Sequence, residues 1–187
     1  LDKLKVQTDF MGVNYYSDSF IGLPRPEDKP LIEEGLFPFP HRMNGTAPGP
    51  YTDMGWPVTP HGIKDLLMRI KQDWPMIDSI AVTENGAAYD YPVEQGEVND
   101  YKRADYLVQH IEQLGEAIDQ GSALDSYFIW SFLDNFEWAE GYQKRFGVVH
   151  VDFDTLERVP KLSAKLYKDI VASNGGNIRK IIESIRV

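Results

Sequence analysis

Cysteine is absent from the sequence, which excludes disulfide bridges, thiolate nucleophiles and sulfur-ligated metal sites. Basic residues are scarce: 19 lysines and arginines face 29 aspartates and glutamates, so the formal net charge is −10. A nucleic-acid partner is therefore not expected. No apolar run approaches the length of a membrane span, so no membrane partner is expected either. The four histidines lack the spacing of metal ligands, and we expect neither a metal nor another cofactor.

The residues that are present suffice for a hydrophobic core. The chain has 187 residues, of which 42% are hydrophobic and 12% aromatic. A length of this order predicts one domain, spanning residues 1–187. Composition does not fix the compartment, because a chain without disulfides can reside anywhere; the cytoplasm is favoured.

Short apolar runs alternate with stretches of helical periodicity. Strands are predicted at residues 8–16, 79–84 and 126–133. Three helices are predicted. The first begins at Thr59-Pro60, the second runs from the cap Asn99-Asp100 to Gly121, and the third covers residues 163–173. A region rich in proline, glycine and aspartate, residues 17–56, separates the first strand from the first helix. Loops of that length in compact domains are usually functional.

The order strand, helix, strand, helix, strand, helix predicts parallel strands covered by helices. A doubly wound sheet and a (β/α)8 barrel both fit this order. A nucleotide-binding sheet would carry a glycine-rich turn between strand and helix, which the sequence lacks. Polar residues instead follow each predicted strand directly, which favours a barrel, where chemistry gathers at the carboxyl ends of strands. A complete barrel typically has about 250 residues, so three strand–helix units predict a partial one.

Glu84 ends the second predicted strand and precedes the turn residues Asn85 and Gly86. Such a carboxylate is either a solvated cap or a placed functional group. Aromatic, amide and carboxylate side chains are dense near the other strand ends: Asn14, Tyr15, Tyr16, Trp130, Phe136, Glu137, Trp138 and Tyr142. Aromatic faces pack against the C–H faces of sugars, and amides and carboxylates hydrogen-bond hydroxyls, so this mixture favours a carbohydrate pocket. The alternative is a barrel mouth filled by its own loops.

Four segments resemble glycoside hydrolase family one. Residues 9–16 (DFMGVNYY) resemble the segment of the sixth barrel strand, and 83–87 (TENGA) resemble the nucleophile motif of the seventh. Residues 130–142 (WSFLDNFEWAEGY) resemble the sugar-binding segment of the eighth, and 160–164 (PKLSA) the start of the final helix. The four matches follow the family's order over almost the whole chain. The resemblance implies an α/β fold, the C-terminal portion of a (β/α)8 TIM barrel with strands six to eight.

The resemblance implies a retaining glycosidase that cleaves β-D-glucosides. Glu84 would be the catalytic nucleophile, which forms a covalent glycosyl-enzyme. The Tyr16 hydroxyl would donate to Glu84, favour its ionised form and fix its orientation. Asn14 would be a neighbouring hydrogen-bonding partner in the pocket.

Five further residues would bind the substrate. By the same resemblance, Glu137 would accept hydrogen bonds from two sugar hydroxyls, and the Trp138 N–H would donate to a neighbouring one. Trp130 would form the apolar floor under the ring. Trp56 would lie on the aglycone side and Phe146 near the primary hydroxyl, with ordinary packing as the alternative for both. A carboxylate at Glu137 would repel a phosphate dianion, which favours unphosphorylated glucosides over 6-phosphorylated ones.

Retaining hydrolysis needs a second carboxyl as acid/base. The family carries it in an Asn-Glu-Pro motif, and this sequence has none. We therefore expect the acid/base glutamate on an N-terminal barrel segment, which would be the chain's partner along with a β-glucoside or oligosaccharide substrate. The isolated chain is expected to be inactive. The competing hypothesis is a non-catalytic carbohydrate-binding or structural half-barrel.

Overall fold

A computed structural model describes residues 8–22, 41–42, 47–178 and 180–181. In chain order, its elements are β1 (Met11–Asn14), β2 (Ile21–Gly22), β3 (His41–Arg42), α2 (Pro60–Asp73), β4 (Ile80–Asn85), α3 (Tyr101–Asp119), β5 (Leu124–Ile129), the 3-10 helix η4 (Trp138–Glu140), β6 (Val149–Val151), β7 (Arg158–Pro160) and α4 (Leu162–Ala172).

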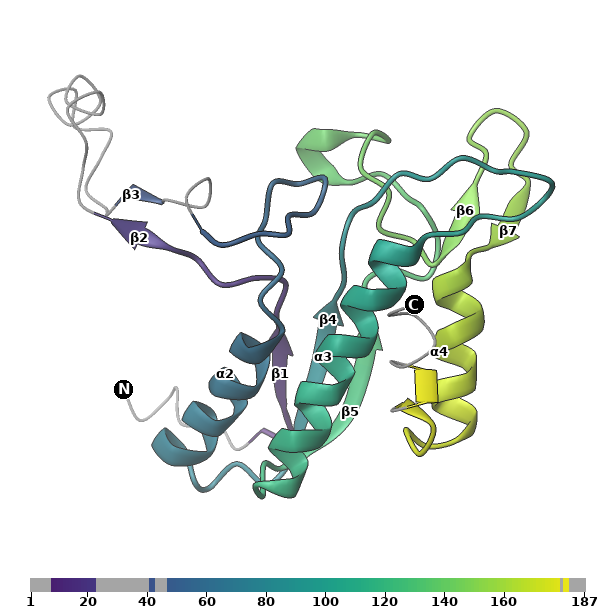
Figure 1. Ribbon diagram of the computed structural model, residues 1–187. Helices are drawn as coiled ribbons and strands as arrows, with labels where there is room; N and C mark the ends of the chain where they lie inside the picture. The colour runs from purple at the N-terminus through teal and green to yellow at the C-terminus, as the bar shows by residue number, and fades with distance from the viewer. Residues whose placement is uncertain (1–7, 23–40, 43–46, 179, 182–187) are drawn as a thin grey trace, which may run out of the picture.

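Strands β1, β4 and β5 form a three-stranded sheet in that order. Both neighbouring pairs are parallel, as β1 pairs with β4 and β4 with β5. Along the chain, α2 lies between β1 and β4, α3 lies between β4 and β5, and α4 follows β5 (Figure 1). The predicted order of strands and helices is confirmed, and parallel pairing directs the carboxyl ends of all three strands to one edge.

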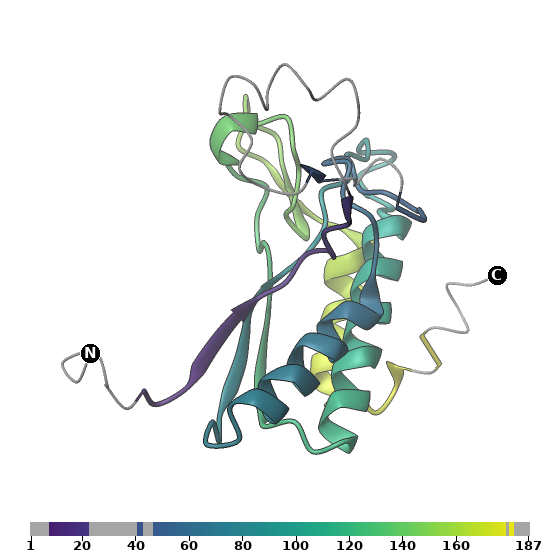
Figure 2. The same cartoon turned by 90° about the vertical axis from the view of Figure 1, so that its left-hand side faces the viewer.

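The helices lie on one face of the sheet (Figure 2). Their apolar stripes meet the outward-facing side chains of the strands, as the 3.6-residue and two-residue periods require. The main core cluster consists of Val13, Tyr15, Ile63, Leu67, Ile70, Ile80, Val82, Leu114 and Ala117. A second cluster, which includes Tyr106 and Val148, lies toward the carboxyl ends of the strands and supports the loops there.

The opposite face of the sheet carries large apolar side chains that water reaches. Phe10, just before β1, is 54% exposed, and Phe128 of β5 is 58% exposed. Neither β1 nor β5 has a further sheet partner among the described residues. Unpaired edges and exposed aromatics are features that proteins normally cover.

Several local predictions differ from the structure. Strand β5 begins at Leu124 and ends at Ile129, because the chain bends at Trp130 to pair through Leu133 with Val149. The antiparallel β6–β7 hairpin was not predicted, since its strands are too short for a recognisable period. Most of the predicted loop 17–56, and part of the apolar pattern after Gly176, lie outside the described residues.

No helix in the described part of the chain is long and apolar enough to cross a membrane.

Candidate functional site

Strands β1 and β4 bring Tyr16 and Glu84 together at their carboxyl ends. Asn14 is the register partner of Glu84, and the Tyr15 backbone N–H donates to the Glu84 carbonyl at 2.9 Å. Just beyond this pairing, the Tyr16 hydroxyl donates to Glu84 Oε2 at 2.6 Å. The pair predicted from the sequence therefore lies in contact, 68 residues apart in the chain.

The surroundings keep Tyr16 a neutral donor. Burial raises the pKa of Tyr16 well above its ordinary value, and the hydrogen bond to Glu84 and its negative charge raise the pKa further. A hydroxyl that stays protonated can donate to a carboxylate throughout the physiological range. A donor of this kind fixes the orientation of the carboxylate and stabilises its charge.

Asn14 lies exposed at the end of β1, beside Glu84. The Thr83 hydroxyl donates to Asn14 Oδ1 at 2.6 Å, which anchors the amide across the two strands. Thr83 was not singled out in the sequence as a site residue. The sequence feature that could have indicated Thr83 is its position immediately before Glu84. Because side chains alternate between the two faces of a strand, Thr83 lies on the opposite face from the buried Val82.

Trp56 and Phe146 both pack around Tyr16. The ring of Tyr16 lies 5.4 Å from Trp56 and 6.0 Å from Phe146, and Trp56 lies 6.1 Å from Phe146, measured between centroids. Phe146 is 2% exposed, whereas Trp56 is half-buried. Edge-to-face pairs of this kind restrict ring motion, so both residues form the wall that holds Tyr16 against Glu84.

Glu137 and Trp130 form a second group of predicted residues. The Trp130 indole N–H donates to Glu137 Oε2 at 3.4 Å, so the loop after β5 folds back over the strand end. Trp138, the first residue of η4, is 82% exposed. Its indole is therefore open to solvent and available for a contact from outside this chain.

The buried carboxylate of Asp134 holds the loop that carries Glu137 and Phe146. Its oxygens accept hydrogen bonds from Lys161 Nζ at 2.8 Å, Arg145 Nη1 at 2.9 Å and the Gly147 N–H at 3.0 Å. Burial lowers the pKa of Lys161 to about 8, although the charge of Asp134 opposes that shift. Asp134 lies in the segment 130–142 that resembles the family, but the sequence assigned it no role because its cationic partners are supplied by tertiary contact.

Gly86 is required by the close approach of two strand ends. A methyl group at this position would collide with the carbonyl oxygen of Trp130. The absence of a side chain lets the segment after Glu84 pass beside the segment after β5. This contact brings the Glu84 region and the Trp130–Glu137 region to one edge of the sheet.

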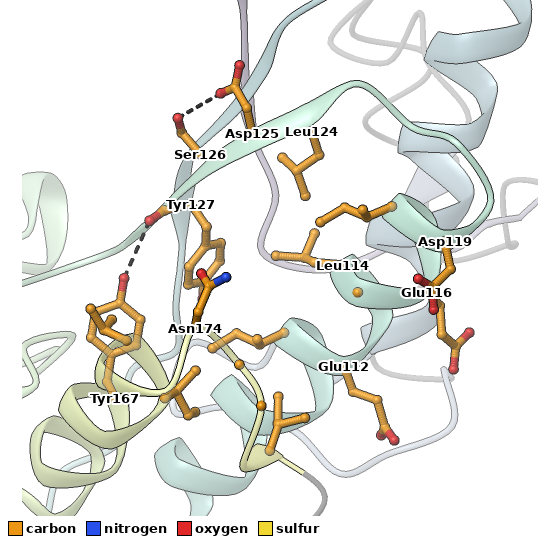
Figure 3. A pocket seen from close by; sticks show the side chains of 18 residues that line it. Glu112, Leu114, Glu116, Asp119, Leu124, Asp125, Ser126, Tyr127, Tyr167 and Asn174 are labelled. Atoms are coloured by element: carbon orange, nitrogen blue, oxygen red, sulfur yellow. Dashed lines mark hydrogen bonds between the residues drawn. The ribbon is translucent and has the colours of Figure 1, made fainter.

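A cavity of 610 Å³ lies elsewhere, between α3, the amino-terminal part of β5 and α4 (Figure 3). Tyr127 and Tyr167 line it, and the Tyr167 hydroxyl donates to the Tyr127 carbonyl at 3.4 Å. None of the eight predicted site residues lines this cavity. Within the described ranges, no group of three histidines or carboxylates is placed to hold a metal ion.

The comparisons with known proteins agree with this geometry. A family model described as glycosyl hydrolase family 1 matches residues 1–176. A 1,4-beta-D-glucan glucohydrolase of Thermotoga neapolitana is 41% identical over 178 residues, which are 94% of this chain and 37% of the relative. A 6-phospho-beta-galactosidase of Streptococcus mutans is 40% identical over 91% of this chain and 38% of its own length.

Solved structures show the same relation. The beta-glucosidase of Thermotoga maritima in complex with castanospermine is 40% identical and superposes with a TM-score of 0.82 over 93% of this chain and 37% of its own. The chain thus spans little more than a third of the proteins it matches. Its β1, β4 and β5 with their helices are part of a (β/α)8 barrel, as the sequence predicted.

Proposed function

The chain belongs to glycosyl hydrolase family 1, and from that premise we propose that it supplies the nucleophile and much of the sugar pocket of a retaining β-glucosidase. The observation that carries the proposal is the 2.6 Å hydrogen bond from Tyr16 to Glu84 at the carboxyl ends of β1 and β4. An oriented carboxylate at the end of a barrel strand suits nucleophilic attack. Trp56 and Phe146 pack against the Tyr16 ring that donates to this carboxylate.

The proposed reaction has two steps. Glu84 attacks the anomeric carbon and forms a glycosyl ester while the bond to the aglycone oxygen breaks, and an acid gives that oxygen a proton. The conjugate base of that acid then removes a proton from water, which attacks the anomeric carbon and releases Glu84. The carboxyl of this acid/base residue must lie about 5–5.5 Å from the nucleophile. We assign the acid/base residue to an N-terminal barrel segment because this sequence lacks the Asn-Glu-Pro motif.

The proposed substrate is an unphosphorylated β-D-glucoside. Overall similarity does not decide this, because the relatives at 41% and 40% identity carry names of both a glucan glucohydrolase and a 6-phospho-beta-galactosidase. The local charge favours the neutral sugar. Glu137 presents a carboxylate beside the Trp130 indole, and the negative charge of this carboxylate would repel the phosphate group of a phosphorylated sugar.

The proposed partner of this chain is a segment that completes the sheet. Strands β1 and β5 are the two ends of the sheet order β1-β4-β5. The exposed side chains Phe10 and Phe128 lie at these same ends, and Phe132, just after β5, is 70% exposed. Pairing of both edges by further strands would close the barrel and bury these aromatic rings.

The test uses a completed barrel, defined as this chain joined to the part of Thermotoga maritima beta-glucosidase that it does not match. We expect the completed barrel to hydrolyse p-nitrophenyl β-glucoside, and Glu84→Gln or Glu84→Gly to abolish hydrolysis without loss of folding. A 2-deoxy-2-fluoro glucoside should label Glu84 covalently, as mapped by mass spectrometry. Label on any other carboxylate of a folded, active barrel would overturn the assignment.

A non-catalytic half-barrel is the second candidate. The observation that favours it is the absence of the acid/base motif from the sequence. It predicts saturable binding of glucosides by the chain and no Glu84-dependent turnover in the completed barrel. Calorimetry with a β-glucoside, run beside the hydrolysis assay, separates the two candidates.

A further inference from the structure

Asn85 lies directly after Glu84 but is fully buried. Its side-chain Nδ2 donates to the Tyr15 carbonyl at 2.8 Å and to the Tyr106 hydroxyl at 3.0 Å. Its Oδ1 accepts from the Tyr127 hydroxyl at 2.9 Å. Three hydrogen bonds to one buried amide satisfy most of its donors and acceptors, which gives it one orientation.

Tyr106 extends this network to the peptide that carries Tyr16. Its hydroxyl donates to the Tyr16 carbonyl at 2.8 Å while accepting from Asn85. The Tyr106 ring is 1% exposed and stacks on His110 one turn later in α3, with 3.9 Å between centroids. Helix α3 therefore holds the hydroxyl in place from behind the sheet.

We infer that Asn85 and Tyr106 are positioning residues for the nucleophile, an inference that rests on the proposed function of Glu84. Together they fix the carbonyls of Tyr15 and Tyr16, which belong to the two peptide groups on either side of the Tyr16 Cα. The Tyr16 ring projects from that backbone to its 2.6 Å hydrogen bond with Glu84. Hydrogen bonds weaken steeply with misalignment, so a peptide that rotates loosens the contact that orients the carboxylate.

The side chains of Asn85 and Tyr106 are both buried behind the strand ends. Their side-chain hydrogen bonds are with the Tyr15 and Tyr16 carbonyls and with tyrosine hydroxyls, and the Tyr106 ring stacks on His110. Loss of the Asn85 or Tyr106 hydrogen bonds should lower the rate at which Glu84 attacks, with little effect on sugar affinity. This difference between rate and affinity distinguishes a positioning residue from a sugar-binding residue.

The experiment measures inactivation of the completed barrel by 2,4-dinitrophenyl 2-deoxy-2-fluoro-β-glucoside. Its activated leaving group departs without acid assistance, so the rate constant reports attack by the nucleophile. The initial burst of dinitrophenolate counts functional sites, so a partly unfolded variant alters the burst amplitude and leaves the rate constant interpretable.

Tyr106→Phe removes only the hydroxyl, and we expect it to lower the inactivation rate constant about 3- to 10-fold while the inhibition constant changes less than about 3-fold. These values lie below the roughly 10- to 100-fold expected for complete loss of a hydrogen bond to a charged group in Tyr16→Phe. The matched control is Tyr167→Phe, which removes a part-buried hydroxyl that donates to the Tyr127 carbonyl, outside the hydrogen bonds of Asn85 and Tyr106. It should stay within about 2-fold of wild type.

A double-mutant cycle completes the test. In a Tyr16→Phe background, the hydroxyl that Tyr106 positions is gone, so Tyr106→Phe should have no further effect on the rate constant. Equal effects of Tyr106→Phe in both backgrounds, or equal effects of Tyr106→Phe and Tyr167→Phe, would overturn the positioning role while Glu84 labelling upholds the proposed function. Absence of label on Glu84 in the wild type would overturn both.

Discussion

At the scale of single residues, Glu137 carries the specificity prediction. Replacing it with glutamine keeps the shape and removes the negative charge. A hydrogen bond to a charged partner contributes about 1.5–3 kcal/mol, so Glu137→Gln should lower kcat/KM of the completed barrel on p-nitrophenyl β-glucoside about 10- to 100-fold. Its relative activity on the 6-phosphoglucoside should rise, because the repulsive charge is absent.

Glu140→Gln is the matched control for that substitution. Glu140 lies in the same loop, is exposed, and loses the same charge. Its kcat/KM should remain within about 2-fold of wild type, as expected for a surface position. A wild-type barrel that prefers the 6-phosphoglucoside would contradict the role of Glu137.

At the scale of an element, α3 contains a buried histidine whose charge state affects stability. His110 is fully buried. Its Nδ1 lies 2.7 Å from the Tyr106 carbonyl, and its Nε2 has no hydrogen-bond partner among the described residues. Burial lowers the pKa of His110 from 6.5 to about 4. Protonation would place an unpaired N–H and a charge in the core.

The direction of the pH effect follows from that shift. Between pH 6.5 and 4 the unfolded chain binds a proton at His110 that the folded chain does not, so stability falls as the pH falls through this window. The loss from this group should be roughly 2 kcal/mol between pH 7 and pH 5. Urea unfolding followed by tryptophan fluorescence measures it.

Two histidine variants test whether His110 causes the loss of stability at low pH. His110→Gln should remove the His110 contribution to that loss, whereas His61→Gln, at a side chain that is 63% exposed, should leave it unchanged. Comparison with wild type at each pH cancels the contribution of all other groups. An unchanged pH dependence in His110→Gln would show that the histidine is not kept neutral.

At the scale of the whole molecule, the open sheet predicts the behaviour of the chain by itself. In the described part of the chain, β1 and β5 have unpaired edges, and these edges together with the exposed phenylalanines favour self-association. General acid catalysis typically contributes about 10²–10⁴-fold, so the chain without a partner should show no meaningful turnover of cellobiose. Light scattering and steady-state hydrolysis, with and without the complementary barrel segment, test both expectations. The complement should restore a single species and activity together.

The control is a completed barrel with Glu84→Gln, which should be equally monodisperse and inactive. Robust cellobiose hydrolysis by the isolated chain would mean that a second acid within these residues replaces the expected one, and the partial-enzyme hypothesis would be wrong.

The sequence by itself determined the strand and helix order and the family to which the chain belongs, whereas the identity of the pocket residues stays a prediction. Apolar periodicity is local, so the positions of β4 and α3 were predicted within a few residues. The segment around Glu84 was identified because the motif is contiguous and carries its own chemistry. The short β6 and β7 offered too few residues for a period, and their pairing depends on the bend at Trp130.

Tertiary structure alone decided which groups hold the pocket in place. Asn85 looks like a turn residue in the sequence, yet its amide contacts Tyr15, Tyr106 and Tyr127, which lie just after β1, in α3 and in β5. Asp134 likewise acquires Arg145 and Lys161 only when the loops after β5 close. Local patterns record the period of a strand or helix, whereas contacts between distant segments are set by how the elements pack. The sequence therefore predicted the role of Glu84, and the fold showed which distant groups contact the segment that carries Tyr16.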